Sequence, residues 1–338
     1  MYRISLITGD GIGPELAKSA VSVLETINDK LDLRVSTELV DAGDSALKKT
    51  GKALPDDTMS SVKKSDSCLK APVGESAADV IIVLRRDLDL YANIRPAKSY
   101  PNMNALRDDV DLVIVRENTE DLYIGKEFEI DDTIVALRTT SKHASRRIAE
   151  RAFDMAKQRD GKKIVTCVHK SNVMRKSDGL FAKTCSEAVQ NYPEIKFEQM
   201  YVDACAMNLI RQPQKFDVIV TTNLFGDILS DESAQVVGGL GMAPAANIGN
   251  EFGLFEPVHG AAFDIAGKNI ANPSSFILSI KMMLDWLGIK NDDKKCFDVS
   301  KKLENTISGV VKDGIRTKDI GGTKSTTEFT EEVTSRLV

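Results

Sequence analysis

Two carboxylates, Asp227 and Asp231, stand four residues apart in the segment Asn-Leu-Phe-Gly-Asp-Ile-Leu-Ser-Asp. The apolar run 216–220 before it is typical of a buried strand, and the segment itself opens a stretch of helical period. Because four residues make about one helical turn, both carboxylates leave the same face near the start of that helix. Mg²⁺ and Mn²⁺ bind carboxylate oxygens presented in this way. Taken alone, the pair is more often the acidic first turn of an ordinary helix, so its surroundings must decide.

Three arginines are candidates for binding the carboxylates of a substrate. Arg85 and Arg95 flank the segment 87–91, and Arg116 directly follows the predicted buried strand 111–115. A guanidinium group holds a carboxylate through two parallel hydrogen bonds, so several arginines around one pocket suit a di- or tricarboxylate. Any one of them taken alone is more simply part of a surface ion pair.

Three further polar side chains follow predicted strands. Tyr123 comes shortly after the strand that precedes the third arginine, Lys170 follows strand 163–169, and Asp203 follows strand 197–202. Such strand ends are the usual place for a ligand in open α/β sheets. A desolvated lysine there is able to carry a proton, although a single lysine is more often simply solvated. Asp203 is a third candidate carboxylate.

The elements that position these residues alternate along the whole chain between short apolar runs and helical patterns. This alternation predicts an α/β protein whose sheet is largely covered by helices. Further strands are expected at 3–8, 33–40, 68–73 and 134–138, and helices at 143–158, 274–287, 294–312 and 326–338.

Two glycine-rich regions interrupt this alternation. In the turn 9–15 the glycines do not complete the dinucleotide fingerprint, because Pro14 takes the place of its last glycine. They predict a tight strand-to-helix turn close to a ligand. The second region, 238–249, is interpreted as a crossing between domains that leads into the loop 256–272. That loop is either a backbone surface for a flat ligand or an ordinary surface loop.

Composition excludes several classes of protein. With 338 residues, 42% of them hydrophobic, the chain is able to bury a large core and to divide into two domains. The net charge of −5, without a basic block, argues against nucleic acid as a partner. No signal peptide or long apolar run occurs, so we expect a cytoplasmic protein without a membrane partner. Five widely spaced cysteines and three histidines favour a reduced compartment and argue against a zinc site.

Taken together, the motifs resemble the β-decarboxylating dehydrogenase family of isopropylmalate, isocitrate, homoisocitrate and tartrate dehydrogenases. The resemblance covers essentially the whole chain and rests on 9–15, 84–96, 116–123, 169–172, Asp203, 223–231 and 256–272. It implies a non-Rossmann α/β fold with one domain formed by 1–97 and 239–338, a second formed by 98–238, and an active cleft between them. It also implies a homodimer, with a tetramer left open, in which Lys170 and Asp203 complete the neighbour's site.

The resemblance assigns a role to each candidate residue. It implies Mg²⁺ or Mn²⁺ on Asp203, Asp227 and Asp231, a base at Lys170, and a proton donor at Tyr123. The implied substrate-binding residues are Arg85, Arg95, Arg116, Ile81, Ile82 and Asn172. The implied cofactor-binding residues are His259, Gly260, Ala261, Ala262, Asp264, Ile265 and Asn272. A carboxylate at Asp264 would accept a hydrogen bond from a free ribose 2'-hydroxyl and repel a 2'-phosphate, which predicts NAD rather than NADP.

The residues before Arg85 bear on the choice of substrate. Isocitrate enzymes of this family have Ser and Asn where this chain has Asp79 and Ile81, and homoisocitrate enzymes often have Arg where it has Ile82. The two isoleucines suit an isopropyl group, because an unpaired carboxylate buried against them would cost several kcal/mol. We expect NAD-dependent oxidative decarboxylation of (2R,3S)-3-isopropylmalate to 4-methyl-2-oxopentanoate and CO₂, a step of leucine biosynthesis, as in archaeal-type isopropylmalate dehydrogenases.

Two alternatives stay open. The chain has Ala78 where bacterial isopropylmalate enzymes usually have Glu, and its segment 118–121 is closer to isocitrate and homoisocitrate enzymes. Arg86 is a further cation for a distal carboxylate. An NAD-dependent isocitrate or homoisocitrate dehydrogenase is therefore the first alternative. The second is a non-catalytic regulatory subunit, although such relatives usually lose the tyrosine, the lysine or a metal aspartate, all of which are present here.

Overall fold

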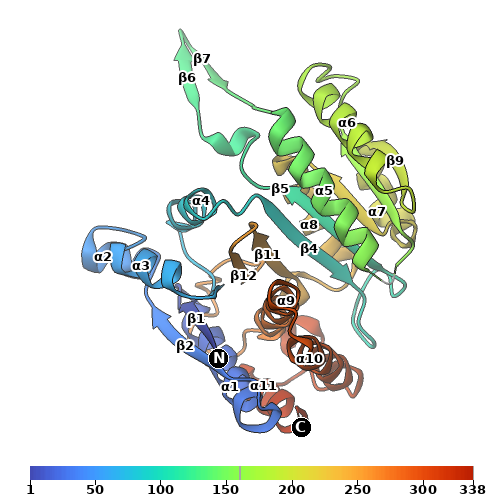
Figure 1. Cartoon of the computed structure of the whole chain (residues 1–338). Coiled ribbons are helices and arrows are strands. Elements are labelled where there is room, and N and C mark those ends of the chain that lie inside the picture. Colours follow the sequence, from blue (N-terminus) through green and yellow to red (C-terminus); the bar gives the residue numbers. More distant parts are fainter. Residues whose placement is uncertain (160, 338) are drawn as a thin grey trace.

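A ten-stranded mixed sheet runs through the whole computed structural model, which describes residues 1–159 and 161–337 (Figure 1). The strand order is β2-β1-β3-β12-β11-β4-β5-β10-β8-β9. The strands are β1 (Tyr2–Ile7), β2 (Val35–Val40), β3 (Ser67–Lys70), β4 (Ala92–Lys98), β5 (Asp111–Glu117), β8 (Ile164–His169), β9 (Lys196–Tyr201), β10 (Val218–Thr221), β11 (Pro244–Ile248) and β12 (Gly253–Pro257). A separate hairpin of β6 (Glu127–Ile130) and β7 (Thr133–Ala136) projects from the rest (Figure 1).

The centre of the sheet is antiparallel and its two outer parts are parallel. β4 pairs antiparallel with both β5 and β11, and β11 pairs antiparallel with β12. The segments 1–97 and 239–338 supply the strands from β2 to β4, whereas 98–238 supplies those from β5 to β9. The predicted domain boundary thus falls between two paired strands, and the division into domains stays a prediction.

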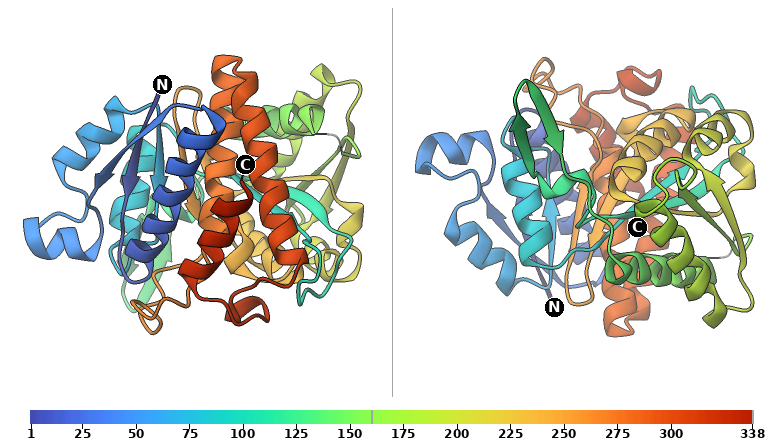
Figure 2. Two further views of the ribbon diagram at one scale, coloured as in Figure 1. Left: turned by 90° about the horizontal axis from the view of Figure 1, so that it is seen from below. Right: turned by 90° about the horizontal axis from the view of Figure 1, so that it is seen from above.

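Helices cover both faces of the sheet. One face carries α1 (Gly13–Leu31), α5 (Lys142–Gln158), α6 (Ser177–Ala188) and α9 (Ser274–Asn291), with α10 (Lys294–Lys312) and α11 (Thr326–Arg336) packed outside them. The other face carries α2 (Asp44–Thr50), α3 (Asp56–Lys64), α4 (Ala77–Asp87), α7 (Val202–Arg211) and α8 (Asn223–Val236). Figure 2 shows α1, α9, α10 and α11 gathered on one side of the molecule. No helix within the described ranges is long and apolar enough to cross a membrane.

The apolar core is continuous on one face and divided on the other. On the face of α1, α5 and α9, a single cluster extends from Leu6 to Val165 across nearly the whole sheet. On the opposite face, one cluster lies under α4 and a second lies under α8. Polar side chains occupy the space between these two clusters, and this space holds the candidate site.

Most predicted strands and helices are confirmed with small shifts at their ends, and the turn 9–15 joins β1 to α1 as expected, but two later segments contain strands that were not expected. The segment 238–249, expected as a crossing, contains β11, and the expected loop 256–272 begins as the end of β12. β11 is Pro-Ala-Ala-Asn-Ile, and β12 begins with Gly and ends with Pro, and Gly, Pro and Asn usually indicate turns. Their central position in the sheet overrides that local preference. The predicted C-terminal helix is present to Arg336, and its expected last residue, 338, lies outside the described residues.

Candidate active site

Helix α8 places the two carboxylates beside the arginines. It begins at Asn223 directly after β10, so Asp227 and Asp231 lie on successive turns near its start. The Oδ1 atom of Asn223 accepts hydrogen bonds from Arg116 Nε (2.9 Å) and Nη2 (2.7 Å). A Cβ atom at Gly226 would lie 2.5 Å from Arg116 Cγ. Glycine at this position therefore lets the helix pack directly on the arginine side chain.

Five of the predicted site residues meet at this point. Asp227 accepts hydrogen bonds from Arg116 Nη1 and from the Tyr123 hydroxyl, and its Oδ1 atom lies 3.4 Å from Arg95 Nη2. Arg95 Nη1 lies 3.1 Å from Asp231 Oδ1. Arg95 comes from β4, Arg116 from β5, and Tyr123 from a short 3₁₀ helix, Leu122–Ile124. The structure thus joins two cations, two carboxylates and a phenol from four segments of the chain.

The environment gives the two carboxylates different acidities. Burial raises the pKa of Asp227, but the nearby Arg116 and Arg95 outweigh burial and hold the pKa below its ordinary value. For Asp231, burial and the neighbouring Asp227 charge prevail over Arg95, and its pKa is raised. Burial also raises the pKa of Tyr123, against the influence of Arg116. Tyr123 therefore keeps its proton at neutral pH, as a proton donor must.

Arg85, the third arginine, is oriented by a buried polar network. Its Nε donates to Asn247 Oδ1 at 2.9 Å, and the same oxygen accepts from Asn93 Nδ2 (2.7 Å) and Asn118 Nδ2 (3.0 Å). Asn247 in turn donates to Glu256 Oε1 at 2.7 Å. Asn247 and the network role of Glu256 were missed from the sequence. The only feature of the sequence that could have indicated Asn247 is that it is a polar residue within a run of small residues.

The charges at the end of this network balance one another. Glu256 Oε2 lies 2.7 Å from Lys70 Nζ, and its Oε1 lies 3.8 Å from Arg85 Nη2. Burial alone would raise the pKa of Glu256, but Lys70 and Arg85 outweigh it and lower the pKa to about 2. Burial lowers the pKa of Arg85 to about 10, and Glu256 opposes that change. Glu256 is thus a fixed anion beside Arg85.

Lys170 and Asp203 form a separate pair. Lys170 follows β8, and its Nζ donates to Asp203 Oδ1 at 2.7 Å at the start of α7. The hydrogen bond from Lys170 lowers the pKa of the exposed Asp203 carboxyl. The structure does not bring Asp203 to Asp227 and Asp231 within one chain: among the described residues, no three His, Cys, Asp or Glu side chains are grouped so that they could hold a metal. Asn172 lies exposed in the turn after Lys170.

A buried ion network links the segments that carry these groups, and it too was missed from the sequence. Arg138 Nε donates to Asp121 Oδ1 at 2.6 Å, and Arg138 is also paired with Asp178. Asp178 accepts from the backbone N–H of Lys170 at 2.6 Å, and Asp121 accepts from the backbone N–H of Leu224 at 3.1 Å. Arg138, through Asp121 and Asp178, therefore holds together three segments: the loop of Lys170, the 3₁₀ helix of Tyr123 and the start of α8.

A cavity of about 330 Å³ opens beside the arginines. Its lining includes Ile82, Arg85, Asn118 and Tyr123, and also Arg86, Asp89, Thr119, Ile124 and Arg147. Ile82 is 38% exposed and belongs to this wall. Ile81, one residue earlier on α4, is partly buried and packs against the core beneath the helix. Of the two isoleucines considered from the sequence, only Ile82 lines the cavity.

The predicted cofactor loop rests on the first glycine turn. The backbone N–H of Ile12 donates to Ala261 O at 2.8 Å. A Cβ atom at Gly11, whose φ is +56°, would lie 2.0 Å from that oxygen, so only glycine fits there. Nothing lies within 4 Å of the Cβ position of Gly260. The glycine turn thus supports the loop from below and leaves its outer surface open to a ligand.

The other residues of this loop differ in exposure. Ala262 and Asp264 are exposed, Ile265 packs partly buried against the core, and His259 Nδ1 lies 3.1 Å from Gly260 O. Asn272 is buried, and its side chain contacts Asp319 and the backbone N–H of Ser274, at 3.0 and 2.9 Å. Asp264 is therefore available to a ligand, whereas the Asn272 side chain is engaged within the fold.

Comparisons with known proteins decide the family. The sequence pattern of the isocitrate/isopropylmalate dehydrogenase family matches residues 3–333. The chain belongs to this family. A 3-isopropylmalate dehydrogenase of Archaeoglobus fulgidus is 50% identical over 337 residues, covering 100% of both chains. An isocitrate/homoisocitrate dehydrogenase of Thermus thermophilus is 45% identical, covering 99% of this chain and 98% of the relative. The crystal structure of isocitrate dehydrogenase from Methylococcus capsulatus is 40% identical, with a TM-score of 0.92 and coverage of 100% and 99%.

These findings confirm two of the expectations from the sequence. The isocitrate/isopropylmalate dehydrogenase family is the one that the motifs resembled, and its α/β fold is the one observed. The chain is accordingly an oxidoreductase of the dehydrogenase type. Family membership alone does not choose among the substrates that the relatives' names contain.

Proposed function

We propose that this protein is an NAD-dependent 3-isopropylmalate dehydrogenase. The observation that carries the proposal is the position of Ile82, which lines the cavity next to Arg85 and presents an apolar wall to the substituent of a bound malate. The cations near this wall already have partners: Arg147 Nη1 lies 2.8 Å from Asp89 Oδ1, and Arg86 Nε lies 3.1 Å from Asp87 Oδ1. An apolar substituent therefore fits this wall better than a third carboxylate. The 50% identical relative named for isopropylmalate supports the same choice.

Three arginines would bind the malate part of the substrate. Arg85, Arg95 and Arg116 all face the space between α4 and α8, and each is largely buried. Buried guanidinium groups hold carboxylates in a fixed orientation, which places the C2 hydrogen for transfer. Arg95 and Arg116 also contact Asp227, so these two guanidinium groups would be shared between Asp227 and the substrate carboxylates.

The residues fit a divalent cation and a nicotinamide cofactor. Asp227 and Asp231 present carboxylate oxygens from one helix face, with side chains 36% and 53% exposed, and a third ligand would come from the partner's copy of Asp203. When bound, Mg²⁺ or Mn²⁺ would polarise the 2-hydroxyl and its carboxylate, and NAD⁺ would accept the hydride. We assign NAD because the exposed Asp264 favours a free ribose 2'-hydroxyl.

Two residues of the chain would move protons. Lys170 of the second subunit would take the proton of the 2-hydroxyl while the hydride leaves C2, which yields a β-keto acid. Loss of CO₂ then leaves an enolate, and Tyr123, whose raised pKa keeps it protonated, would donate its proton to the enolate carbon. Asp227 accepts a hydrogen bond from the Tyr123 hydroxyl and so fixes its direction.

A homodimer with shared sites supplies the missing pair. Lys170 and Asp203 lie together at the exposed start of α7, apart from the other acidic ligands. Large apolar side chains are exposed around them, among them Met207 and Ile210 on α7 and Ile228 on α8, which are 65%, 58% and 59% exposed. The hairpin exposes more: Phe128, Ile130 and Ile134. Exposed apolar surface of this kind fits a contact between subunits in which α7 of one chain lies against α8 of the other.

The substrate is tested by NADH formation with isopropylmalate, isocitrate and homoisocitrate measured side by side in Mg²⁺. We expect kcat/KM for isopropylmalate to exceed that for isocitrate and that for homoisocitrate by about tenfold or more. The reason is that their third carboxylate would lie against the apolar wall without a partner. A higher value for isocitrate or homoisocitrate would favour the second candidate, to which the 45% identical Thermus relative points. No NADH from any of the three would favour a non-catalytic subunit.

A further inference from the structure

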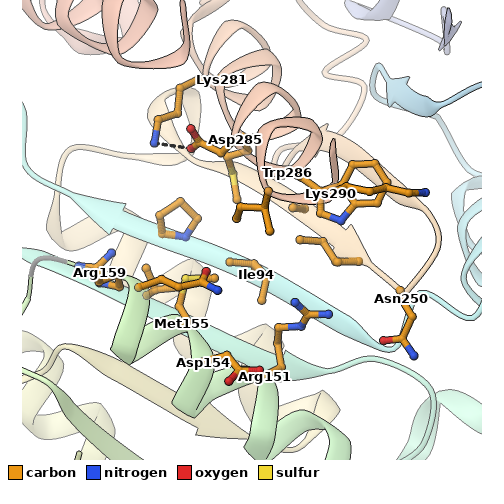
Figure 3. Close-up of a pocket in the computed structure, with 18 of the residues that line it drawn as sticks. Ile94, Arg151, Asp154, Met155, Arg159, Asn250, Lys281, Asp285, Trp286 and Lys290 are labelled. Atoms are coloured by element: carbon orange, nitrogen blue, oxygen red, sulfur yellow. Dashed lines mark ion pairs between the residues drawn. The ribbon is translucent and has the colours of Figure 1, made fainter. Parts of the chain in front are cut away.

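A second large cavity lies on the face of the sheet opposite the arginines (Figure 3). Its volume is about 850 Å³, and we call it the rear cavity. One wall is α5, with Arg151, Asp154 and Met155, and the other is α9, with Lys281, Trp286 and Lys290. Its floor is the centre of the sheet. Drug-sized and metabolite-sized ligands occupy cavities of this size, roughly 300–1,000 Å³.

The floor of the rear cavity is the reverse side of the active site. Ile94 of β4 lines the cavity, whereas its neighbour Arg95 contacts Asp231 on the other face. Likewise, Ala246 and Ile248 of β11 line the cavity, and Asn247 between them holds Arg85. This arrangement follows from the alternation of side chains along a strand. Only the thickness of the sheet separates the two sites.

The polar groups of the rear cavity are unevenly paired. Lys281 is paired with Asp285 at 2.9 Å, and Arg159 with Asp217 at 3.1 Å. Within residues 1–159 and 161–337, neither Arg151 nor Lys290 makes an ion pair. Arg151 Nη2 donates to the Tyr91 hydroxyl at 3.0 Å, and its buried Nε has no hydrogen-bond partner there.

Lys290 completes the cationic side of the cavity. It donates to the backbone oxygen of Glu251, and its Nζ lies 4.9 Å from the centroid of the Trp286 ring. Three acids line the cavity: Asp154 accepts from Tyr192 at 3.0 Å, Asp285 accepts from Ser300 and Lys281, and the exposed Glu251 contacts Lys290 through its backbone oxygen. Two cations without a carboxylate partner therefore stand beside an apolar floor and an aromatic ring.

We propose that the rear cavity binds a small organic carboxylate with an apolar body and that its occupancy alters catalysis on the opposite face. The carboxylate pairs with Arg151 and Lys290, and the apolar body covers Ile94, Ile248 and Trp286. Charge-assisted hydrogen bonds to an arginine and burial of the chain on the floor supply the affinity.

The coupling follows from which segments the ligand touches. α5 belongs to the segment 98–238 together with Arg116, whereas α9 belongs to 239–338, which packs with the segment that carries Arg85 and Arg95. A ligand that sets the spacing of α5 and α9 therefore sets the angle between the two halves of the sheet. The three arginines span the same two halves, so their separation changes with it. This inference goes beyond the proposed function, and its binding test requires no turnover.

Binding is tested with octanoate as the probe on the purified full-length protein. Trp286 is the only tryptophan of the sequence, so its fluorescence reports on this cavity. We expect a saturable change with one site per chain, and much weaker responses to octan-1-ol, which lacks the charge, and to acetate, which lacks the chain. Lys290 lies over the tryptophan ring, so replacing it changes the fluorescence even without a ligand. Calorimetry therefore provides a second measurement of binding.

Variants decide whether the cations bind the probe. Lys290→Gln, at an exposed position, and the double variant Arg151→Gln/Lys290→Gln should weaken octanoate binding about tenfold or more, whereas Lys301→Gln on the outside of α10 should not. Equal affinity in wild type and both variants, equal binding of octan-1-ol, or absence of saturation would overturn the proposal.

Coupling is tested by kinetics at saturating octanoate. At an octanoate concentration just sufficient to saturate the wild type, we expect kcat/KM of the wild type to change at least about twofold and that of the double variant to change much less, since the double variant is then mostly unoccupied. Unchanged kinetics in the wild type would overturn the coupling. Competitive inhibition that persists in the double variant would place octanoate on the substrate arginines and would also overturn it.

Discussion

Lys170 Nζ lies 2.7 Å from Asp203 Oδ1, so the proposed base and the proposed third metal ligand are held as one unit. In the proposed two-fold symmetric dimer this unit would reach the neighbour's site, and each site would draw on both chains. We predict that Lys170→Met and Asp227→Asn are each inactive alone but partly restore activity when mixed after unfolding and refolding together. Half of the dimers would then be mixed, with one intact site each, which gives about a quarter of wild-type activity.

The control for this experiment mixes Asp227→Asn with Tyr123→Phe, two residues that lie in the same site through the hydrogen bond between them. In a mixed dimer of these two variants, one site lacks Asp227 and the other lacks the Tyr123 hydroxyl, so neither site is intact and no recovery of activity is expected. Recovery is therefore compared with separately refolded variants mixed without exchange. Activity no higher than that of the unexchanged mixture would contradict shared sites.

Ile82 is the position that should control the substrate. Ile82→Arg places a cation in the wall of the cavity next to Arg85, so we expect the ratio of kcat/KM for homoisocitrate to that for isopropylmalate to rise at least about tenfold. Ile81→Val is the matched control, because Ile81 packs on the core. It should leave that ratio unchanged and lower the free energy of unfolding by about 1 kcal/mol. An unchanged ratio in Ile82→Arg would show that residue 82 does not face the substrate.

The sequence predicts a site residue well when its position depends on the local strand or helix pattern, and poorly when it depends on contacts with distant segments. Asp227, Asp231 and Arg116 belong to runs with a clear strand or helix pattern, so their place at strand ends is predicted locally. Asn247 acts through contacts with β4, β12 and α4, and no local pattern indicates these contacts. The same holds for β11 itself, whose small residues are typical of a turn. A central strand of that composition is stable only because its neighbours cover it.

Asn247 should therefore matter for substrate binding although it does not reach the substrate. Asn247→Ala removes the acceptor of Arg85 Nε and of two buried amides, at a cost of about 1–3 kcal/mol for each unsatisfied group. We expect KM for the hydroxy acid to rise about tenfold or more, with a smaller effect on kcat, because Arg85 loses its orientation. Steady-state kinetics at saturating NAD checks this. A stable variant with unchanged KM would contradict a positioning role.

Asp264 should determine the choice of cofactor. It is exposed in the loop after β12, so Asp264→Lys alters charge without disturbing packing. The substitution replaces a carboxylate that repels a 2'-phosphate with a cation that attracts it. We therefore expect the ratio of kcat/KM for NADP to that for NAD to rise about tenfold or more. Lys268→Gln, exposed in the same loop, serves as the control variant. A wild type that already prefers NADP would show the assignment of NAD to be wrong.

The buried pair of Glu256 and Lys70 should appear in the dependence of stability on pH. The folded-state pKa of Glu256 is about 2, below the ordinary value of 4.5. A carboxyl with a lowered folded pKa stabilises the fold fully above its unfolded pKa, and this contribution is lost as the pH falls towards the folded pKa. Between about pH 4.5 and pH 2 the wild type should therefore lose about 3 kcal/mol that is assignable to this group. Glu256→Gln has no proton to gain there, so it should be less stable at pH 7 but lose less on acidification. Urea unfolding of both proteins at pH 7 and at pH 3, well inside that window, measures the difference, and parallel losses in the two proteins would contradict it.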